Sequence, residues 1–303
     1  MKAKVCILTS VHLPFDTRIF HKEAKSLSKA GYNVALVAQH GKDEIVDGIR
    51  IIPLPKPKNR LERMTKTVWL AYQKALKIDA DIYHFHDPEL IPIGLLLKRH
   101  GKRVIYDVHE DYPEAIPSKH YLSLWVRKLI AWVFEKFERF AANSLSGIIP
   151  ATPTIAKRFE SINKSTVIIQ NFPILSEFHT GKTVPWRKRS NAVVYVGGIV
   201  VMRGAKEMVE AIRLTSKKTN VRLILAGNFY PRSLRKEIES MEGWKQTEYL
   251  GYLSYEKVAS LLGRVKIGLV LIHPEPRYQV SYPVKLFEYM SAGIPVIASD
   301  FPL

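Results

Sequence analysis

Lys285 and Glu288 have the spacing of a ligand-binding pair on one helix face. They stand three residues apart in segment 281–300, which we predict to be a helix between two apolar strands, ended by Gly293 and Pro295. In an α/β sheet, a helix that begins after a strand can hold a phosphate at its N-terminus. A lysine there suits the phosphate charge, and a glutamate one turn later can accept hydrogen bonds from sugar hydroxyls. The same spacing also fits an amphipathic helix with a surface ion pair, so spacing alone leaves both interpretations open.

A second candidate anion site follows the expected strand 192–196. Gly197 and Gly198 come directly after it, and Arg203 and Lys206 stand where the next helix begins. Glycines allow the backbone to approach a phosphate, and the basic side chains supply charge. The pattern is neither G-x-G-x-x-G nor a Walker A motif, so it is weak by itself. It gains weight because its two cations and Lys285 would start helices at one sheet edge, where they could converge on one anion.

In the first half of the chain, the turn after the expected strand 5–9 carries His12, Asp16 and Arg18. These residues precede a helix that we expect over 18–30. Asp16 can cap that helix with its carboxylate, or it can take part in catalysis, and the sequence does not separate the two roles.

Two histidines, His84 and His86, end another expected strand, 82–86. Strand alternation puts them on one face, which is the geometry of a metal-binding pair. The interpretation that one is buried and the other lies in the loop is favoured, because the sequence indicates no third ligand. We therefore predict no metal.

The turn at 107–114 holds one histidine and four acidic residues directly after an apolar strand. His109 and Glu110 stand at its centre. A histidine at the carboxyl end of a strand can hydrogen-bond a polar substrate or a leaving-group oxygen. Loop solvation is the alternative, but the position at the expected ligand crevice favours a functional role.

Apolar strands alternate with helices through nearly the whole chain, which predicts parallel sheets covered on both faces. The α/β class follows, with two doubly wound domains at 1–170 and 192–303 joined by a linker at 171–191 that lacks a clean period. The expected first-half elements are strands 33–38, 48–54, 103–108, 147–150 and 166–170 and helices 61–77, 90–100 and 122–142. The expected second-half elements are strands 222–226, 248–251, 266–272 and 295–299 and helices 205–215, 231–241 and 255–262.

The charge balance points to an anionic partner. The chain has 303 residues, with 46 Lys and Arg against 28 Asp and Glu, a net charge of +18. Nucleic acid, phosphorylated ligands or an anionic membrane would each fit, as would general basicity for solubility. Because basic residues are spread over both domains and no recognition motif occurs, we predict no nucleic-acid partner. A basic aromatic helix at 122–142 and the cationic segment 56–77 could contact a membrane, or each could be a core helix with a solvated rim.

The single cysteine, Cys6, lies in an apolar run and offers no disulfide. The apolar run at the N-terminus is too short for a secretory signal, and the sequence contains no window of 18 apolar residues. We expect a cytoplasmic location.

Together these passages resemble the retaining GT-B glycosyltransferases of family GT4, also called group 1. The resemblance rests on HLPFDTRIF (12–20), AGYNVALVA (30–38), HFHDPEL (84–90), DVHEDYP (107–113), the Gly-Gly…Arg-Gly loop at 197–204 and PVKLFEYMSAGIPVI (283–297). It implies two Rossmann-like domains facing across a cleft, with the donor, a UDP- or GDP-sugar, bound mainly to the second domain and the acceptor to the first.

The resemblance also implies residue roles. Glu288 is similar to the glutamate that contacts the donor ribose, Arg203 to the residue that grips the diphosphate, and His109 to the histidine near the transferred sugar. Asp16 and Glu110 are further catalytic candidates. The donor site would include Gly197, Gly198, Lys206 and Lys285, and the acceptor side His12, Arg18 and His86. Such enzymes are thought to use front-face displacement, without a metal or cofactor.

Three features depart from the family pattern. Val280 stands where the first glutamate of the E-x7-E motif is expected, and Gly198 stands where many relatives have an arginine. We hypothesise that Lys285 replaces that missing charge. The third departure is the ending at Leu303, since relatives continue with further strand and helix, so we expect a truncated second domain.

We predict retaining transfer of a sugar to a glycan or lipid-linked acceptor in the synthesis of surface polysaccharide or glycolipid. We expect the protein to be located in the cytoplasm, on the inner face of the cell membrane. The alternatives are a nucleotide-sugar epimerase and an inactive glycosyltransferase-like binding protein.

Overall fold

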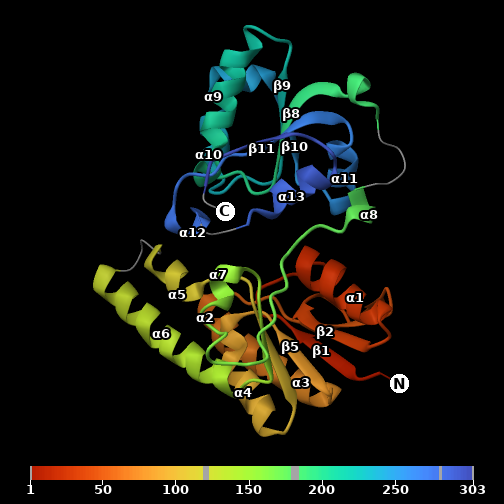
Figure 1. Ribbon diagram of the computed structural model, residues 1–303, viewed down its shortest axis with the longest axis vertical. Helices are drawn as coiled ribbons and strands as arrows, with labels where there is room; N and C mark the ends of the chain where they lie inside the picture. The colour runs from red at the N-terminus through yellow and green to blue at the C-terminus, as the bar shows by residue number, and fades with distance from the viewer. Residues whose placement is uncertain (1, 119–122, 179–183, 280–281, 302–303) are drawn as a thin grey trace. The chain divides into compact units, whose positions relative to one another are not determined.

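The computed structural model describes residues 2–118, 123–178, 184–279 and 282–301 (Figure 1). The chain divides into two compact units, unit 1 from Met1 to Asn171 and unit 2 from Phe172 to Leu303. Each is an α/β unit with its own sheet.

Unit 1 has a seven-stranded sheet in the order β3-β4-β2-β1-β5-β6-β7. All neighbouring strands are parallel except β3, which runs antiparallel to β4. The strands are β1 (Lys4–Leu8), β2 (Asn33–Gln39), β3 (Glu44–Val46), β4 (Ile49–Leu54), β5 (Ile82–Phe85), β6 (Arg103–Val108) and β7 (Gly147–Pro150). Their Val-, Ile- and Leu-rich runs are buried because helices cover both faces.

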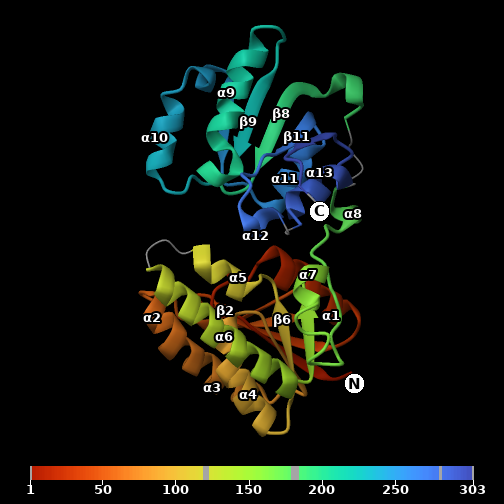
Figure 2. The same ribbon diagram turned by 60° about the vertical axis from the view of Figure 1, so that its left-hand side comes forward.

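The helical segments of unit 1 are η1 (Thr17–Ala24), α1 (Lys25–Lys29), α2 (Arg60–Glu62), η2 (Arg63–Thr67), α3 (Val68–Ile78), η3 (Pro88–Leu90), α4 (Ile91–Arg99), α5 (Tyr112–Ala115), η4 (Ile116–Ser118), α6 (Leu124–Ser144) and α7 (Pro153–Ala156). Helices α3, α4 and α6 pack over one face of the sheet, where they lie side by side (Figure 2). Segments η1 and α1 cover the other face.

Unit 2 has a five-stranded parallel sheet in the order β10-β9-β8-β11-β12. Its strands are β8 (Ser190–Val196), β9 (Arg222–Ala226), β10 (Thr247–Gly251), β11 (Val265–Val270) and β12 (Val296–Ala298). Its helical segments are α8 (Leu175–Phe178), η5 (Trp186–Lys188), η6 (Val201–Arg203), α9 (Ala205–Ser216), α10 (Ser233–Glu239), η7 (Glu242–Gln246), α11 (Tyr255–Leu262), α12 (Pro276–Gln279) and α13 (Val284–Ser291). Helices α9 and α10 pack on one face and α11 and α13 on the other.

The predicted elements are confirmed with small shifts at their ends, apart from two differences. The strand expected over 166–170 is absent from the sheet. There Thr166 forms an isolated bridge with Ile148, and the apolar side chains of 167–169 are exposed. Strand β3 was not predicted; Asp47 and Gly48 join it to β4 through a turn with positive φ at both residues, a typical hairpin signal.

Two further expectations fall partly beyond the described residues. The helix expected from 122 starts at Leu124 in the described part of the chain. Residue 281, the first residue of segment 281–300, lies outside the described residues. The stretch 171–191, which was expected as a linker, contains α8 and η5, and β8 starts at Ser190.

Candidate active site

A buried cluster lies at the carboxyl ends of β1, β5 and β6, which are adjacent in the unit 1 sheet. Strand β6 carries Asp107 next to its last residue, and β5 supplies His84, with His86 just beyond its end. Segment η1 supplies Arg18 and Glu23. This is the edge at which open α/β sheets bind ligands.

Asp107 is fully buried and accepts hydrogen bonds from three directions. Nη2 of Arg18 lies 2.9 and 3.0 Å from its two oxygens, Nε2 of His84 lies 3.2 Å from Oδ2, and Nε2 of His109 lies 3.1 Å from Oδ1. Burial raises the pKa of Asp107, but the bonds from His109 and His84 outweigh it and hold the pKa well below its usual range. The carboxylate is therefore ionised and fully hydrogen-bonded.

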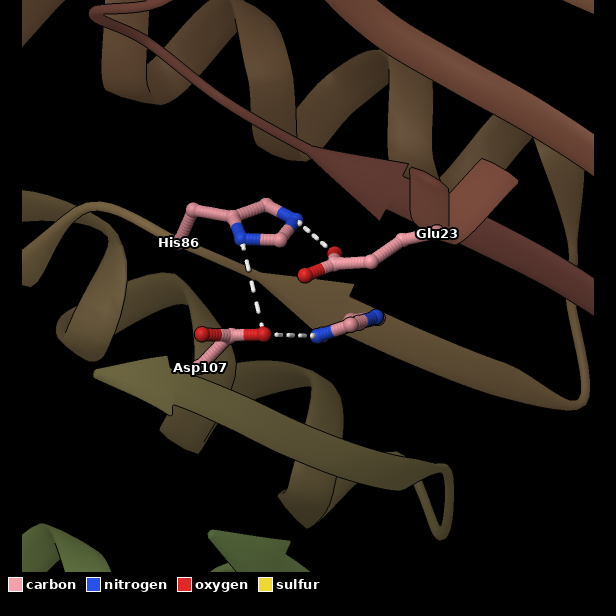
Figure 3. A group of neighbouring side chains, drawn as sticks. Glu23, His86 and Asp107 are labelled. Atoms are coloured by element: carbon pink, nitrogen blue, oxygen red, sulfur yellow. Dashed lines mark hydrogen bonds and ion pairs between the residues drawn. The ribbon is translucent and has the colours of Figure 1, made fainter. Parts of the chain in front are cut away.

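His86 joins this carboxylate cluster to Glu23 (Figure 3). Its Nδ1 lies 3.0 Å from Nε2 of His109 and 4.0 Å from Oδ2 of Asp107, while its Nε2 lies 3.5 Å from Oε2 of Glu23. Burial lowers the pKa of His86, and the neighbouring His84 adds to that effect. Burial also raises the pKa of Glu23, as does the charge of Asp107. Both shifts favour the neutral forms of His86 and Glu23.

Residues of metal-binding type meet in this cluster. Glu23, His84, His86 and Asp107 each place one possible ligand atom within 4.8 Å of the others. The expectation of one buried and one loop-lying histidine holds in part, since His84 is buried in β5 and His86 lies in the loop just after it. His86 is buried as well, however, and the two ring centres are 4.6 Å apart. The sequence indicated no third ligand because Glu23 is remote in the chain. A guanidinium already supplies positive charge here, since Nε of Arg18 lies 2.8 Å from Oε1 of Glu23.

A more open group of side chains lies beside the cluster. Asp16 caps η1, because its Oδ1 accepts hydrogen bonds from the backbone N–H groups of Arg18 and Ile19. Its Oδ2 lies 3.4 Å from Nδ1 of His12. Burial raises the pKa of Asp16, but the bonds from His12 and Ile19 outweigh it and lower the pKa to about 2. Burial lowers the pKa of His12, and the bond to Asp16 with the charge of Asp87 reverses this into a raised value.

Asp87 orders the turn after β1, although it was not among the predicted site residues. Its Oδ2 accepts hydrogen bonds from the Thr9 hydroxyl at 2.8 Å and from the backbone N–H of Ser10 at 2.6 Å. Its Oδ1 lies 3.7 Å from Nε2 of His12. Asp87 was visible in the sequence only as one acid of the segment 84–90.

The predicted residues of unit 1 thus differ in their exposure. His109 and His12 are partly exposed, and Glu110 is exposed. Arg18 and His86, which were expected on the acceptor side, are buried inside the cluster and contact Asp107 and Glu23. Their observed contacts support other side chains.

In unit 2, two basic side chains meet beside the glycine turn after β8. Nζ of Lys285 lies 3.8 Å from the centre of the Tyr195 ring. A Cβ added to Gly197, which has φ +123°, would lie 3.2 Å from that Nζ, and one added to Gly198 would lie 3.5 Å from Nη1 of Arg203. The turn therefore packs directly against both cations.

Lys285 and Arg203 carry positive charge beside this turn. Among the residues that the structure describes, neither forms an ion pair. Burial lowers the pKa of Lys285 well below its usual value, and the charge of Arg203 adds to this, while Glu288 opposes it. Tyr195 donates a hydrogen bond to the Gly198 carbonyl at 2.8 Å, and burial raises its pKa to about 12. The arrangement concentrates positive charge at a partly closed surface.

A cavity of about 230 Å³ adjoins this pair at the carboxyl ends of β8, β9 and β10. Its lining includes Gly197, Gly198, Gly227, Tyr230 and Tyr252. The cavity offers glycine backbone and aromatic side chains to a ligand.

Glu288 and Lys206 are the remaining predicted donor-site residues of unit 2. Glu288 is half-buried on α13, one turn after Lys285. Lys206 forms an ion pair with Glu237 of α10 and is half-exposed, so its observed partner is an acid of its own unit. Val280 lies outside the described residues.

Two family models together cover most of the chain. The model described as "Glycosyltransferase Family 4" matches residues 17–172, and "Glycosyl transferases group 1" matches residues 181–303. The chain belongs to glycosyltransferase family 4. A search of curated proteins finds no match.

Solved glycosyltransferase structures share the fold. Sucrose-phosphate synthase from Thermosynechococcus elongatus superposes with a TM-score of 0.71 at 16% identity, over 99% of this chain and 82% of that one. Anabaena HepE, solved with UDP and glucose, gives 0.68 at 15% identity over 99% and 81%. A glycosyltransferase from Rickettsia africae gives 0.68 at 16% identity over 99% and 80%. The predicted fold class is confirmed: two Rossmann-like α/β units of the GT-B type.

Proposed function

We propose that this glycosyltransferase moves a sugar, with retention, from a nucleotide-diphosphate sugar to a glycan or lipid-linked acceptor. The observation that carries the proposal is the meeting of Lys285 and Arg203 beside the Gly197–Gly198 turn. Two like charges held close together at a partly closed surface repel each other, and a bound anion offsets that cost. Anabaena HepE binds UDP, and an Escherichia coli trehalose-6-phosphate protein binds UDP-2-fluoro glucose, which supports a donor of this class here.

In this proposal the diphosphate lies between the two cations. Lys285 stands in the first turn of α13, so the positive end of that helix adds to the attraction. The nucleobase occupies the cavity at the ends of β8, β9 and β10, where Tyr252 offers a stacking surface. Glu288 accepts hydrogen bonds from the ribose, and Lys206 contributes only long-range charge.

The same cations would serve the chemistry. Negative charge grows on the leaving diphosphate as the glycosidic bond breaks, and fixed positive charges lower the energy of that state. Front-face displacement then needs neither metal nor cofactor. In unit 1, His109 would contact the transferred sugar, and Asp16 and Glu110 are the further catalytic candidates. His12 would contact the acceptor.

We also propose a peripheral site on the inner face of the cell membrane, in the cytoplasm. Helix α6 presents Trp125, Leu129, Trp132 and Phe140 with exposed fractions of 85%, 61%, 57% and 65%. Their spacing puts them along one side of the helix. In the described part of the chain, no helix has both the length and the hydrophobicity for a bilayer crossing. An exposed apolar stripe of this kind suits the headgroup region instead.

The positive charge around this stripe favours an anionic lipid surface as its binding partner. Lys128, Lys136 and Arg139 are exposed on the same helix, against the half-buried acid Glu135. The whole chain carries +18. Such a leaflet would also hold a lipid-linked acceptor close to unit 1.

Calorimetric titration with UDP and with GDP tests the donor site. We expect one of them to bind with a single site per chain. If neither nucleotide binds, the donor proposal fails, and the result favours the alternative of an inactive glycosyltransferase-like binding protein. A nucleotide-sugar epimerase would bind the nucleotide equally well, so product analysis is needed to separate it from a transferase.

A further inference from the structure

The contacts of Asp107 determine which nitrogen of His109 carries a proton. An ionised carboxylate accepts hydrogen bonds and cannot donate them. Nε2 of His109 lies 3.1 Å from Oδ1 of Asp107, so this nitrogen must carry a hydrogen for the contact to be attractive. A lone pair on Nε2 would face a negative oxygen at the same distance.

The neighbouring histidine agrees with this assignment. Nε2 of His109 also lies 3.0 Å from Nδ1 of His86. With the hydrogen on His109, Nδ1 of His86 is an acceptor and its own hydrogen belongs on Nε2. That nitrogen faces the Glu23 carboxyl at 3.5 Å without a hydrogen bond, so no contact there requires the opposite tautomer. The hydrogen on Nε2 of His109 therefore faces two acceptors, Oδ1 of Asp107 and Nδ1 of His86.

We propose that Asp107 is a positioning residue that fixes the tautomer of His109, so that the neutral form of the ring has its proton on Nε2. The remaining ring nitrogen, Nδ1, is then a lone-pair acceptor on a side chain that is 16% exposed. Arg18 holds Asp107 in place through bonds to both carboxylate oxygens, and His84 occupies a further acceptor site on Oδ2. The ring can thus neither flip nor exchange its tautomer without breaking a bond to a buried charge.

The consequence for the reaction rests on the proposed function. A hydroxyl of the transferred sugar or of the acceptor must donate its hydrogen to Nδ1 of His109. A deoxy analogue and a deoxyfluoro analogue at that hydroxyl should both bind poorly, because fluorine cannot donate. If His109 were the donor, the fluoro analogue would retain part of the interaction.

The tautomer itself is measured without any substrate. Long-range ¹H–¹⁵N NMR of the full chain, at a pH where the imidazole is neutral, separates a protonated ring nitrogen from one with a lone pair. A His109→Gln variant identifies the signals of His109 by their loss. We expect a protonated Nε2 and an unprotonated Nδ1, and the opposite pattern would overturn the proposal.

Two variants then test the part played by Asp107. In Asp107→Asn the amide can donate to Nε2, so His109 should shift its proton to Nδ1. His84→Gln also removes a partner of Asp107 but leaves the bond to His109, so the Nε2–H form should persist. An unchanged tautomer in Asp107→Asn, or an equal shift in both variants, would contradict the assignment. Because these results need no donor, they remain informative if the proposed function fails.

Discussion

Lys285 places its ammonium group 3.8 Å from the centre of the Tyr195 ring, inside unit 2. A cation over an aromatic face gains electrostatic stabilisation without losing its charge. The ring therefore holds the lysine in place and favours its ammonium form, against the burial that lowers its pKa. Arg203 adds a second charge nearby, and that charge lowers the pKa of the same phenol against the larger effect of burial.

Replacing Lys285 with alanine should weaken the binding of the nucleoside diphosphate by about 1–3 kcal/mol, the usual cost of losing a charge-assisted contact. Calorimetric titration measures the change. Lys206→Ala is the matched control, since that side chain is already paired with Glu237, and its effect should be much smaller. Unchanged affinity in Lys285→Ala would show that Lys285 does not contact the diphosphate.

Nucleotide binding should be accompanied by proton uptake. Burial and the charge of Arg203 lower the pKa of Lys285 in the free protein. A bound diphosphate favours the ammonium form and raises that pKa, so between the free and bound values the complex holds more protons than the free protein. Affinity should therefore fall as pH rises through this window. Titrations in buffers of different ionisation enthalpy report the proton uptake, which Lys285→Ala should abolish; uptake that persists would assign it to another group.

Asp16→Ala should lower the free energy of unfolding at pH 7 by about 0.5–2 kcal/mol, because η1 loses its N-cap. The pKa of Asp16 is depressed from 3.8 to about 2, so its contribution is present above pH 3.8 and is lost as pH falls towards 2. Urea unfolding of both proteins at pH 7 and at pH 3 measures this. A difference that grows at pH 3 would contradict the assignment.

Gly227→Ala should destabilise unit 2 and disturb the donor turn. Gly227 has φ +146°, and an added Cβ would lie 1.9 Å from the Gly197 carbonyl oxygen. We expect a loss of about 3 kcal/mol or more in the free energy of unfolding, together with weaker nucleotide binding. Gly251→Ala is the control, since Gly251 has φ +66° but nothing within 4 Å of the added Cβ, and its cost should be about 1 kcal/mol. Equal costs would remove the argument from close packing.

The stripe on α6 should bind anionic vesicles. A chain with Trp125→Ala and Trp132→Ala should sediment less with phosphatidylglycerol vesicles than the unchanged chain, because both indoles are exposed on one helix side. Trp186→Ala, which removes an exposed tryptophan of unit 2, is the control. Binding should weaken at higher salt and be poor to phosphatidylcholine. Equal sedimentation of all three chains would exclude α6 as the contact surface.

Strand and helix positions follow from the sequence wherever an apolar run is covered by a helix. The run at 166–170 shows the limit of that inference. Its apolar residues lie exposed beside β7, to which the run is joined by backbone hydrogen bonds and an isolated bridge without forming a strand. For the candidate sites, turns after strands pointed to His109 and Arg203, and helix spacing pointed to Lys285. Glu23 was missed because its contact with His86 joins two elements far apart in the chain, and no local pattern records such a contact. The ion pair of Lys206 with Glu237 was invisible for the same reason.

The most direct test is to incubate the full chain with a panel of UDP- and GDP-sugars and a lipid extract, and to analyse the products by mass spectrometry. We predict one donor for which an extracted acceptor gains the mass of one sugar while nucleoside diphosphate is released. We also predict that this product is greatly reduced in Lys285→Ala. An epimerised sugar, or nucleoside diphosphate released equally without acceptor, would contradict sugar transfer.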